Sequence, residues 1–145
     1  MTDDRDDEHQ HLFRWMEYGL RRVSREFDAV IDDEVTRVGH RRLRILQLIP
    51  HDGVRQKELA ERALVTKQAI AELVDALETD GFVERRPDPS DGRAWLVVRT
   101  AAGDRANETA DRAMRTVEEI LAQDIGEENY ARFIDALRAI GEKEA

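Results

Sequence analysis

The chain has 145 residues, contains no cysteine and carries a net charge of −9. This length fits one domain with its own core, and the lack of cysteine excludes disulfides, thiol nucleophiles and thiolate metal sites. No apolar run approaches the roughly 20 residues of a membrane span. The acidic start MTDDRDDEHQH lacks the apolar segment of a signal peptide, so we expect a cytoplasmic protein without a membrane partner.

The acidic residues gather at the two ends of the sequence. Residues 1–8 hold five acids and one arginine, and residues 100–145 hold eleven acids and six bases. The middle of the chain is close to neutral, so local basic surfaces can exist there in spite of the total charge. Nucleic acid therefore remains an allowed partner, with binding expected to be modest and sensitive to salt.

Residues 11–31 have the apolar spacing of one helical face. The face consists of Leu12, Met16, Leu20, Val23, Phe27 and Val30, and it is widened by Trp15 and Gly19. Such a helix can pack on the core of its own domain or form a subunit interface, and this segment alone does not distinguish the two.

A second helix is expected over residues 40–49, with Leu43, Leu46 and Ile49 facing inward and Pro50 ending it. The neighbouring stretch 37–44 contains four arginines, a histidine and no acid. A solvated surface is the usual explanation of such a run, and contact with phosphate is the alternative.

Residues 56–80 have the pattern of a helix-turn-helix. A short helix over 56–62 is followed by a turn at 63–65 and by Thr66, whose hydroxyl can cap a longer helix. That helix buries Ile70, Leu73, Val74 and Leu77 and ends before Gly81. In this motif the start of the second helix enters the major groove, which places Thr66, Lys67, Gln68 and Ala71 near the bases.

A hairpin is expected directly after this motif. Its predicted strands are residues 82–86 and 94–99, joined by the turn-rich segment 87–93. A two-stranded hairpin is marginal alone, so Val83, Leu96 and Val98 should pack on the helices. The arrangement is a winged helix-turn-helix, in which arginines at the tip suit a narrow minor groove; the candidates are Arg85, Arg86 and Arg93.

The run KELAERALVTKQAIAELVDALETDGFVERRPDPSDGRAWLVVRTAAG resembles the core of MarR-type transcriptional regulators. The Thr-Lys-Gln start of the second helix, the Leu-Glu-x-x-Gly exit and the Asp-Pro-x-Asp-x-Arg wing carry the resemblance. It implies a homodimer that presents two winged lobes to a pseudo-palindromic operator in double-stranded DNA. It also implies a small aromatic or phenolic ligand, and it assigns base reading to Thr66, Lys67 and Gln68 and the wing tip to Arg93.

The sequence departs from that family pattern in two places. Arg55 stands where many members have a Ser or Thr cap before the first helix of the motif. Glu72 and Asp75 place carboxylates on the outward side of the second helix, where many members have arginine. Because carboxylates repel phosphate, affinity or site preference is expected to differ from that of other members.

Two further helices are expected over residues 101–125, after a Thr100 cap, and over 127–142. Their apolar faces include Ala106, Val117 and Leu121 in the first and Tyr130 and Phe133 in the second. These faces must find the first helix or a second subunit, which favours the dimer interpretation of residues 11–31.

Two other classes of function can be set against a DNA-binding regulator. The four histidines form no metal-binding or catalytic spacing, and no glycine-rich phosphate loop is present, so we expect no enzyme, no cofactor and no metal site. A winged-helix dimer that binds protein without specific DNA binding is the alternative, and the acidic second helix is its main support.

Together these features predict a mainly α fold with a small β-hairpin, organised as a single domain over residues 1–145. Residues 9–35 and 104–145 are predicted to be dimerisation helices, and residues 38–100 a winged helix-turn-helix lobe. Within the lobe the recognition helix should span about 66–80 and the wing about 82–99. The predicted function is that of a sequence-specific, ligand-responsive transcriptional regulator, and we expect it to be a repressor.

Overall fold

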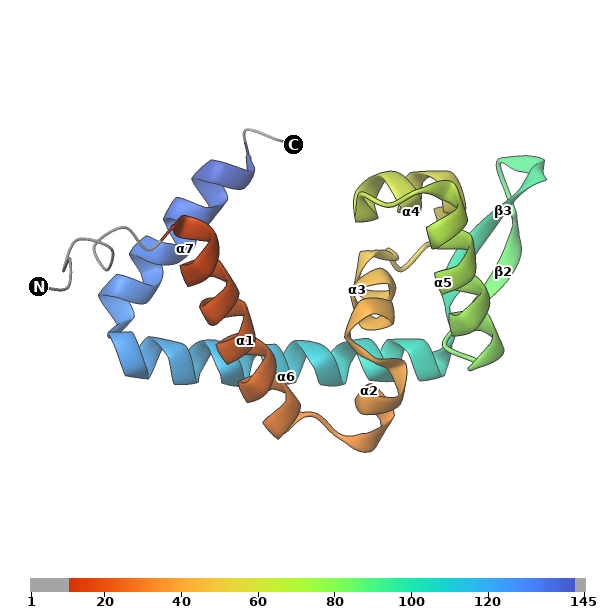
Figure 1. Cartoon of the computed structure of the whole chain (residues 1–145). Coiled ribbons are helices and arrows are strands. Elements are labelled where there is room, and N and C mark those ends of the chain that lie inside the picture. Colours follow the sequence, from red (N-terminus) through yellow and green to blue (C-terminus); the bar gives the residue numbers. More distant parts are fainter. Residues whose placement is uncertain (1–10, 143–145) are drawn as a thin grey trace, which may run out of the picture. The chain divides into compact units, whose positions relative to one another are not determined.

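The computed structural model describes residues 11–142. The acidic segment 1–8 and the outer ends of both predicted dimerisation segments lie outside these residues. The described chain forms seven helices and three short strands, and it divides into two compact units. Residues 31–112 make one unit, and the chain on either side of it makes the other. Figure 1 shows the elements along the chain.

The unit of residues 31–112 opens with two short helices, α2 (Asp33–Val38) and α3 (His40–Leu48). Asp32 caps α2 by accepting a hydrogen bond from the Val35 amide at 3.0 Å. Helix α3 confirms the helix expected over 40–49, whereas α2 was not expected. Both helices contribute fully buried side chains, of which Val38 and Leu46 are examples.

The helix-turn-helix follows as α4 (Gln56–Ala63) and α5 (Lys67–Thr79). As expected, α4 begins without a side-chain cap at Arg55. The buried residues of α5 are Ile70, Leu73, Val74 and Leu77, the four that the sequence predicted. After α5 the chain turns at Gly81, whose positive φ of 80° explains why a glycine ends this helix.

The hairpin consists of β2 (Val83–Asp88) and β3 (Asp91–Arg99), which pair in antiparallel fashion. The expected seven-residue connection over 87–93 is wrong, because the strands continue until only Pro89 and Ser90 join them. A third strand that the sequence did not predict, β1 (Val54–Arg55), pairs with β3 on its other edge. In Figure 1 the hairpin runs beside α5.

The expected packing of the hairpin is correct in part. Val83 and Val98 are buried as predicted, but Leu96 is only half-buried. Val97, which was not predicted to be inside, is 2% exposed. It pairs with Val54 of β1 and with Arg85 of β2, so these three side chains lie on one face of the sheet.

Helix α6 (Ala101–Ile125) begins next to the end of α5. Thr100 caps it as expected, accepting from the Gly103 amide at 3.1 Å while its hydroxyl donates to the Gly81 carbonyl at 2.6 Å. A side chain at position 103 would collide with the Phe82 carbonyl oxygen. Gly103 therefore allows the first turn of α6 to lie directly against the chain that leaves α5.

The second unit contains α1 (Leu12–Val30), the C-terminal part of α6 and α7 (Glu127–Gly141). These helices confirm the expected segments 11–31, 101–125 and 127–142 to within one residue at each end. Few of their apolar side chains are buried: Phe27, Ala113 and Val117 are the buried ones among the described residues of this unit.

Candidate nucleic-acid interface

The N-terminal turn of α5 presents polar side chains to solvent. Thr66 Oγ1 accepts a hydrogen bond from the Ala69 amide at 3.1 Å, which is the predicted cap. Thr66, Lys67 and Gln68 are exposed, and Ala71 is half-buried on the same side of the helix. The buried residues point the opposite way, into the core. The four side chains predicted to face DNA are therefore brought together on the outward face of α5.

Both outward carboxylates of α5 have hydrogen-bonding partners. Glu72 accepts a hydrogen bond from Gln68 Nε2 at 3.2 Å. Asp75 accepts one from Arg85 Nη2 at 2.6 Å. The charge of Asp75 is thus neutralised by Arg85, whereas Glu72 is hydrogen-bonded to a neutral amide and keeps its charge at the surface.

Arg85 connects three elements. Besides Asp75, its guanidinium pairs with Glu78 of α5 and donates to Gln56 Oε1 of α4 at 3.2 Å. The backbone amide of Arg85 also donates to Glu78, at 3.2 Å. The hydrogen bond with Asp75, above all, raises the pKa of the Arg85 guanidinium. Its predicted role as a DNA contact would require it to leave these partners.

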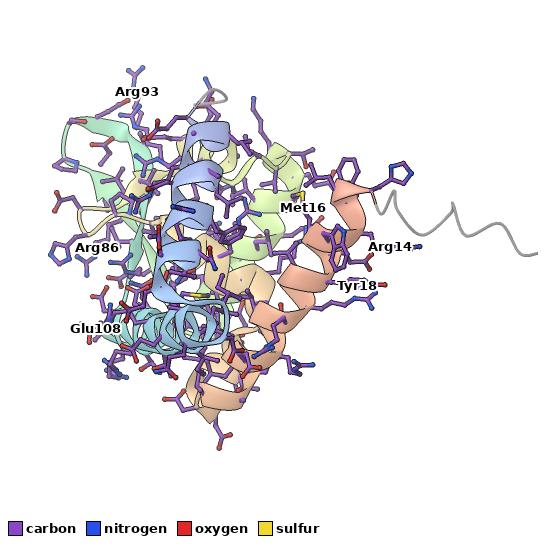
Figure 2. All side chains as sticks on the ribbon, turned by 90° about the vertical axis from the view of Figure 1, so that its left-hand side faces the viewer. Arg14, Met16, Tyr18, Arg86, Arg93 and Glu108 are labelled. Carbon is purple, nitrogen blue, oxygen red and sulfur yellow. The ribbon has the colours of Figure 1, made fainter. Side chains whose placement is uncertain are left out.

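The other two arginines of the wing are placed differently. Arg86 pairs with Glu84 on its own strand, with Nε 2.6 Å from the Glu84 carboxylate. Arg93 lies at the end of the hairpin, and Figure 2 shows its side chain pointing away from the fold. Within residues 11–142 its guanidinium has no hydrogen bond or ion pair, although its backbone amide donates to Asp91 at 3.2 Å. Arg93 is therefore available to a partner.

A buried carboxylate at the start of the Asp-Pro-x-Asp-x-Arg motif holds the wing in place. Asp88 is 7% exposed and accepts hydrogen bonds from the Ser90 amide at 2.8 Å and the Ser90 hydroxyl at 2.6 Å. Arg55 adds a third donor, with Nε 2.8 Å from Asp88 Oδ2. These donors, Ser90 first, lower the pKa of Asp88 to about 2. The signal in the sequence was Asp-Pro-Ser, since an Asp commonly accepts from the residue two positions later in a turn.

The contacts among Asp88, Ser90 and Arg55 also leave the Arg93 guanidinium without a partner in the described chain. From the sequence alone, Arg93 could also pair at the surface with Asp88 or Asp91. Instead Arg55 occupies both carboxylates, with Nη2 2.7 Å from Asp88 and 3.5 Å from Asp91. Arg55, which appeared in the sequence only as a missing helix cap, therefore anchors the tip of the wing to β1.

The arginine-rich stretch 37–44 is used partly for folding. Arg42 pairs with Asp80, at the end of α5, and donates to the Arg37 carbonyl at 2.7 Å. Arg37, Arg41 and Arg44 are exposed. The stretch thus joins α3 to the end of α5 and leaves three arginine side chains at the surface.

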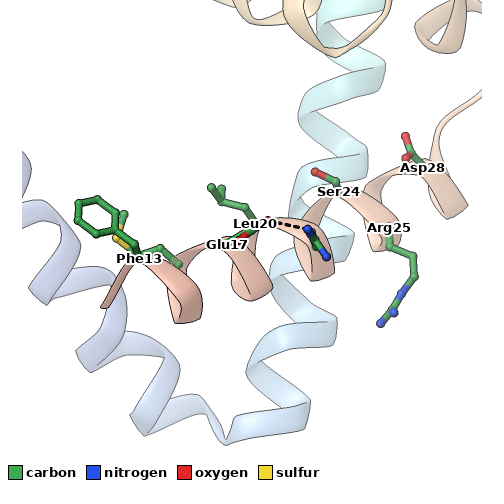
Figure 3. A pocket seen from close by; sticks show the side chains of 8 residues that line it. Phe13, Glu17, Leu20, Ser24, Arg25 and Asp28 are labelled. Carbon is green, nitrogen blue, oxygen red and sulfur yellow. Dashed lines mark hydrogen bonds and ion pairs between the residues drawn. The ribbon is translucent and has the colours of Figure 1, made fainter. Parts of the chain in front are cut away.

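Apolar side chains are exposed along the helices of the second unit. On α1 they include Leu12, Phe13, Trp15, Met16 and Leu20, with exposed fractions between 47% and 80%. A hollow of about 600 Å³ runs along this helix, and Figure 3 shows Phe13 and Leu20 among the side chains that line it. Helix α7 adds Phe133, Leu137 and Ile140.

Two negative findings apply to the described part of the chain. Residues 11–142 contain no group of three or more His, Asp or Glu side chains placed to hold a metal ion. None of their helices combines the length and the apolar character that crossing a membrane requires.

The sequence and the fold were compared with those of known proteins. The MarR family model matches residues 36–94. Transcriptional regulator HosA of Escherichia coli O111:H- is 40% identical over 53 residues, which are 37% of this chain and 39% of that protein. The match thus covers well under half of the relative's length.

Solved structures extend the similarity to the whole fold. Transcriptional regulator Tm0710 of Thermotoga maritima has a TM-score of 0.59 at 28% identity, covering 92% of this chain and 94% of that one. The PcaV transcriptional regulator of Streptomyces coelicolor, in complex with its natural ligand, has a TM-score of 0.69 at 20% identity, covering 100% and 99%. These relatives are named as transcriptional regulators and not as enzymes. The resemblance predicted from the sequence is confirmed: residues 36–94 match the MarR family model, and the fold is similar to that of solved transcriptional regulators over nearly the whole chain.

Proposed function

We propose that the protein is a transcriptional regulator that binds a pseudo-palindromic operator in double-stranded DNA as a homodimer. The observation that carries the proposal is that one lobe exposes both the start of α5 and the tip of the wing. The capped start of α5 presents Lys67 and Gln68, and the adjacent wing presents an Arg93 without a partner in the described chain. This is the arrangement that reads a major groove and a neighbouring minor groove together.

The residues proposed to contact DNA fall into two groups. Thr66, Lys67, Gln68 and Ala71 face the base edges, where amide and ammonium groups can pair with adenine and guanine. Arg86 and Arg93 belong to the wing and face the sugar-phosphate backbone. Arg85 was predicted with them, and its role is tested separately below, because its guanidinium is already bound by Asp75 and Glu78.

A homodimer is supported by the exposed apolar side chains of α1 and α7. Side chains such as Leu20 (65% exposed) and Ile140 (67% exposed) lie open in the single chain, and burying them against a second copy would stabilise both. We propose that residues 9–35 and 104–145 form this dimer interface while residues 38–100 bind DNA. A cytoplasmic repressor that responds to a small aromatic or phenolic ligand completes the proposal, by analogy with the family.

The interaction module without specific DNA binding keeps only part of its support. That alternative rested on the acidity of α5, where Asp75 is paired with Arg85 while Glu72 is hydrogen-bonded to a neutral amide and keeps its charge. Footprinting of the DNA upstream of the protein's own gene separates the two functions. The regulator should protect two half-sites about one helical turn apart. A protein that protects no segment at physiological salt would be an interaction module.

A further inference from the structure

The hydrogen bond between Gln68 and Glu72 joins two exposed side chains one turn apart on α5. Gln68 Nε2 lies 3.2 Å from Glu72 Oε1, and both residues lie on the outward face of the helix. The two residues stand four positions apart, the spacing at which side chains on a helix surface meet. The pair is therefore a single polar unit at the proposed DNA surface.

This bond fixes which way the Gln68 amide faces. A carboxylate can only accept hydrogen bonds, so the nitrogen of the amide must point toward Glu72 and its oxygen away from it. The second amide hydrogen of Gln68 has no acceptor within residues 11–142. The second carboxylate oxygen, Glu72 Oε2, accepts no hydrogen bond from the same residues, and the Glu72 side chain is exposed. The Gln68–Glu72 pair thus offers two acceptors, the Gln68 oxygen and Glu72 Oε2, and one donor, the remaining N–H of the Gln68 amide.

Exocyclic amino groups are the complement of those acceptors in the major groove. Cytosine presents its N4 amino group there and adenine its N6 amino group, whereas guanine presents only the acceptors O6 and N7. A carboxylate is the side chain that accepts from cytosine N4, and it repels the guanine edge. The Gln68 amide can still pair with adenine through its oxygen and its remaining N–H.

We propose that Glu72 is a specificity-determining residue, which accepts from a cytosine amino group while it holds Gln68 in position to read the neighbouring base pair. This inference rests on the proposed function, because it requires α5 to enter the major groove. It differs from the simpler expectation that Glu72 merely repels phosphate. Repulsion would weaken binding to every sequence equally, whereas base reading changes which sequence is preferred.

The test is selection of bound duplexes from a randomised library by the full chain and by three variants. Glu72→Gln removes the charge, Glu72→Asp keeps the charge but shortens the reach, and Glu108→Gln is the control. Glu108 is an exposed carboxylate on α6, labelled in Figure 2, and its loss changes the net charge by the same amount. Affinities for the selected motif and for a scrambled duplex are then measured, with circular dichroism to check folding. Because residue 108 lies in a segment proposed to dimerise, sedimentation velocity checks that Glu108→Gln remains a dimer like the wild type.

The wild type should select a motif with a G·C pair at one symmetric position of each half-site. Glu72→Gln and Glu72→Asp should each lose about tenfold of the discrimination at that position. Glu72→Gln should bind the scrambled duplex no better than Glu108→Gln does. An unchanged motif in both Glu72 variants, or an equal gain of Glu72→Gln on motif and scrambled DNA, would overturn the inference and leave the proposed function standing. If the wild type enriches no motif, the proposed function fails, and this inference fails with it.

Discussion

Arg85 in strand β2 and Asp75 in helix α5 form an ion pair, with Nη2 2.6 Å from Oδ1. Because Arg85 also pairs with Glu78 and donates to Gln56, it joins the wing to both helices of the helix-turn-helix. One guanidinium therefore links the two elements that are proposed to contact DNA. We infer that Arg85 positions α5 and the wing relative to each other.

Replacing Arg85 separates positioning from direct contact with DNA. Arg85→Gln should lower the free energy of unfolding by about 1–3 kcal/mol, since it removes several hydrogen bonds to carboxylates. Operator affinity should fall, while the slope of log affinity against log salt stays the same. A slope reduced by about one unit would show that Arg85 binds a phosphate, as the sequence predicted. Asp75→Asn is the matched variant, and it should reproduce part of the effect on the operator without weakening binding to scrambled DNA.

Arg93 is expected to contact DNA without contributing to folding. Arg93→Ala should leave thermal unfolding and dimerisation unchanged, because within the described chain its guanidinium has no partner. It should weaken operator binding by about tenfold or more and reduce the salt slope by about one unit for each phosphate that the arginine neutralises. Arg93→Lys should restore the charge but only part of the affinity, because an ammonium does not fill a narrow minor groove as a guanidinium does.

The control for this experiment is Arg115→Ala, which removes an exposed arginine from α6 outside the winged lobe. Because residue 115 lies in a segment proposed to dimerise, sedimentation velocity checks that this variant remains a dimer. Operator binding by Arg93→Ala that equals that of the wild type at physiological salt would remove the wing tip from the proposed interface.

Asp88 makes the stability of the fold depend on pH in the acidic range. Its pKa is lowered from 3.8 to about 2 by Ser90 and Arg55. A carboxyl group whose pKa is lower in the folded state stabilises the fold above its ordinary pKa, and this contribution disappears as the pH falls through the folded value. We therefore expect the wild type to lose stability between about pH 4 and pH 2, and Asp88→Asn to lose less over that window while being less stable at neutral pH. Denaturant titrations at several pH values measure both, and parallel curves for the two proteins would contradict the assignment.

Introducing a charged side chain on the apolar face of α1 tests the dimer prediction. Leu20 is 65% exposed and lies in the hollow shown in Figure 3. Leu20→Glu should convert the dimer to monomer and abolish tight operator binding, because a buried unpaired carboxylate is costly at an interface. Thr36→Glu adds the same charge at an exposed position of α2 and should remain dimeric. Sedimentation velocity gives the answer, and a Leu20→Glu protein that still sediments as the wild type does would place the interface elsewhere.

Much of the fold could be predicted from the sequence, because long helices repeat their apolar residues and carry end signals. Thr66, Thr100 and Gly81 marked helix ends correctly. Helix α2 and strand β1 were missed since six and two residues are too few to show a period. Strand β1 exists only because β3 lies beside it, and no local pattern contains that information.

The candidate site was predicted unevenly, for a physical reason. The outward face of α5 follows from helical periodicity, so Lys67 and Gln68 could be placed in advance. The partners of Arg85 and Arg55 depend on how strands and helices meet, across separations of 7 to 36 positions. A sequence that contains an arginine and several acids does not state which of them pair. The turn-rich run after Arg86 likewise hid a continued strand, since the buried Asp88 is satisfied by Ser90 and Arg55 and no longer needs water.

Leu64, in the turn between α4 and α5, has a φ of 54° and an exposed side chain with 86% of its surface in solvent. A left-handed backbone costs a residue with a β-carbon roughly 1–2 kcal/mol, and a side chain in water returns none of it. The greater freedom of glycine in the unfolded chain offsets only part of this cost, so Leu64→Gly should make the protein slightly more stable. Because stability alone does not favour a leucine here, we infer that its exposed side chain contributes to a bound state. A stabilised Leu64→Gly protein that binds the proposed operator less well would show this contribution directly.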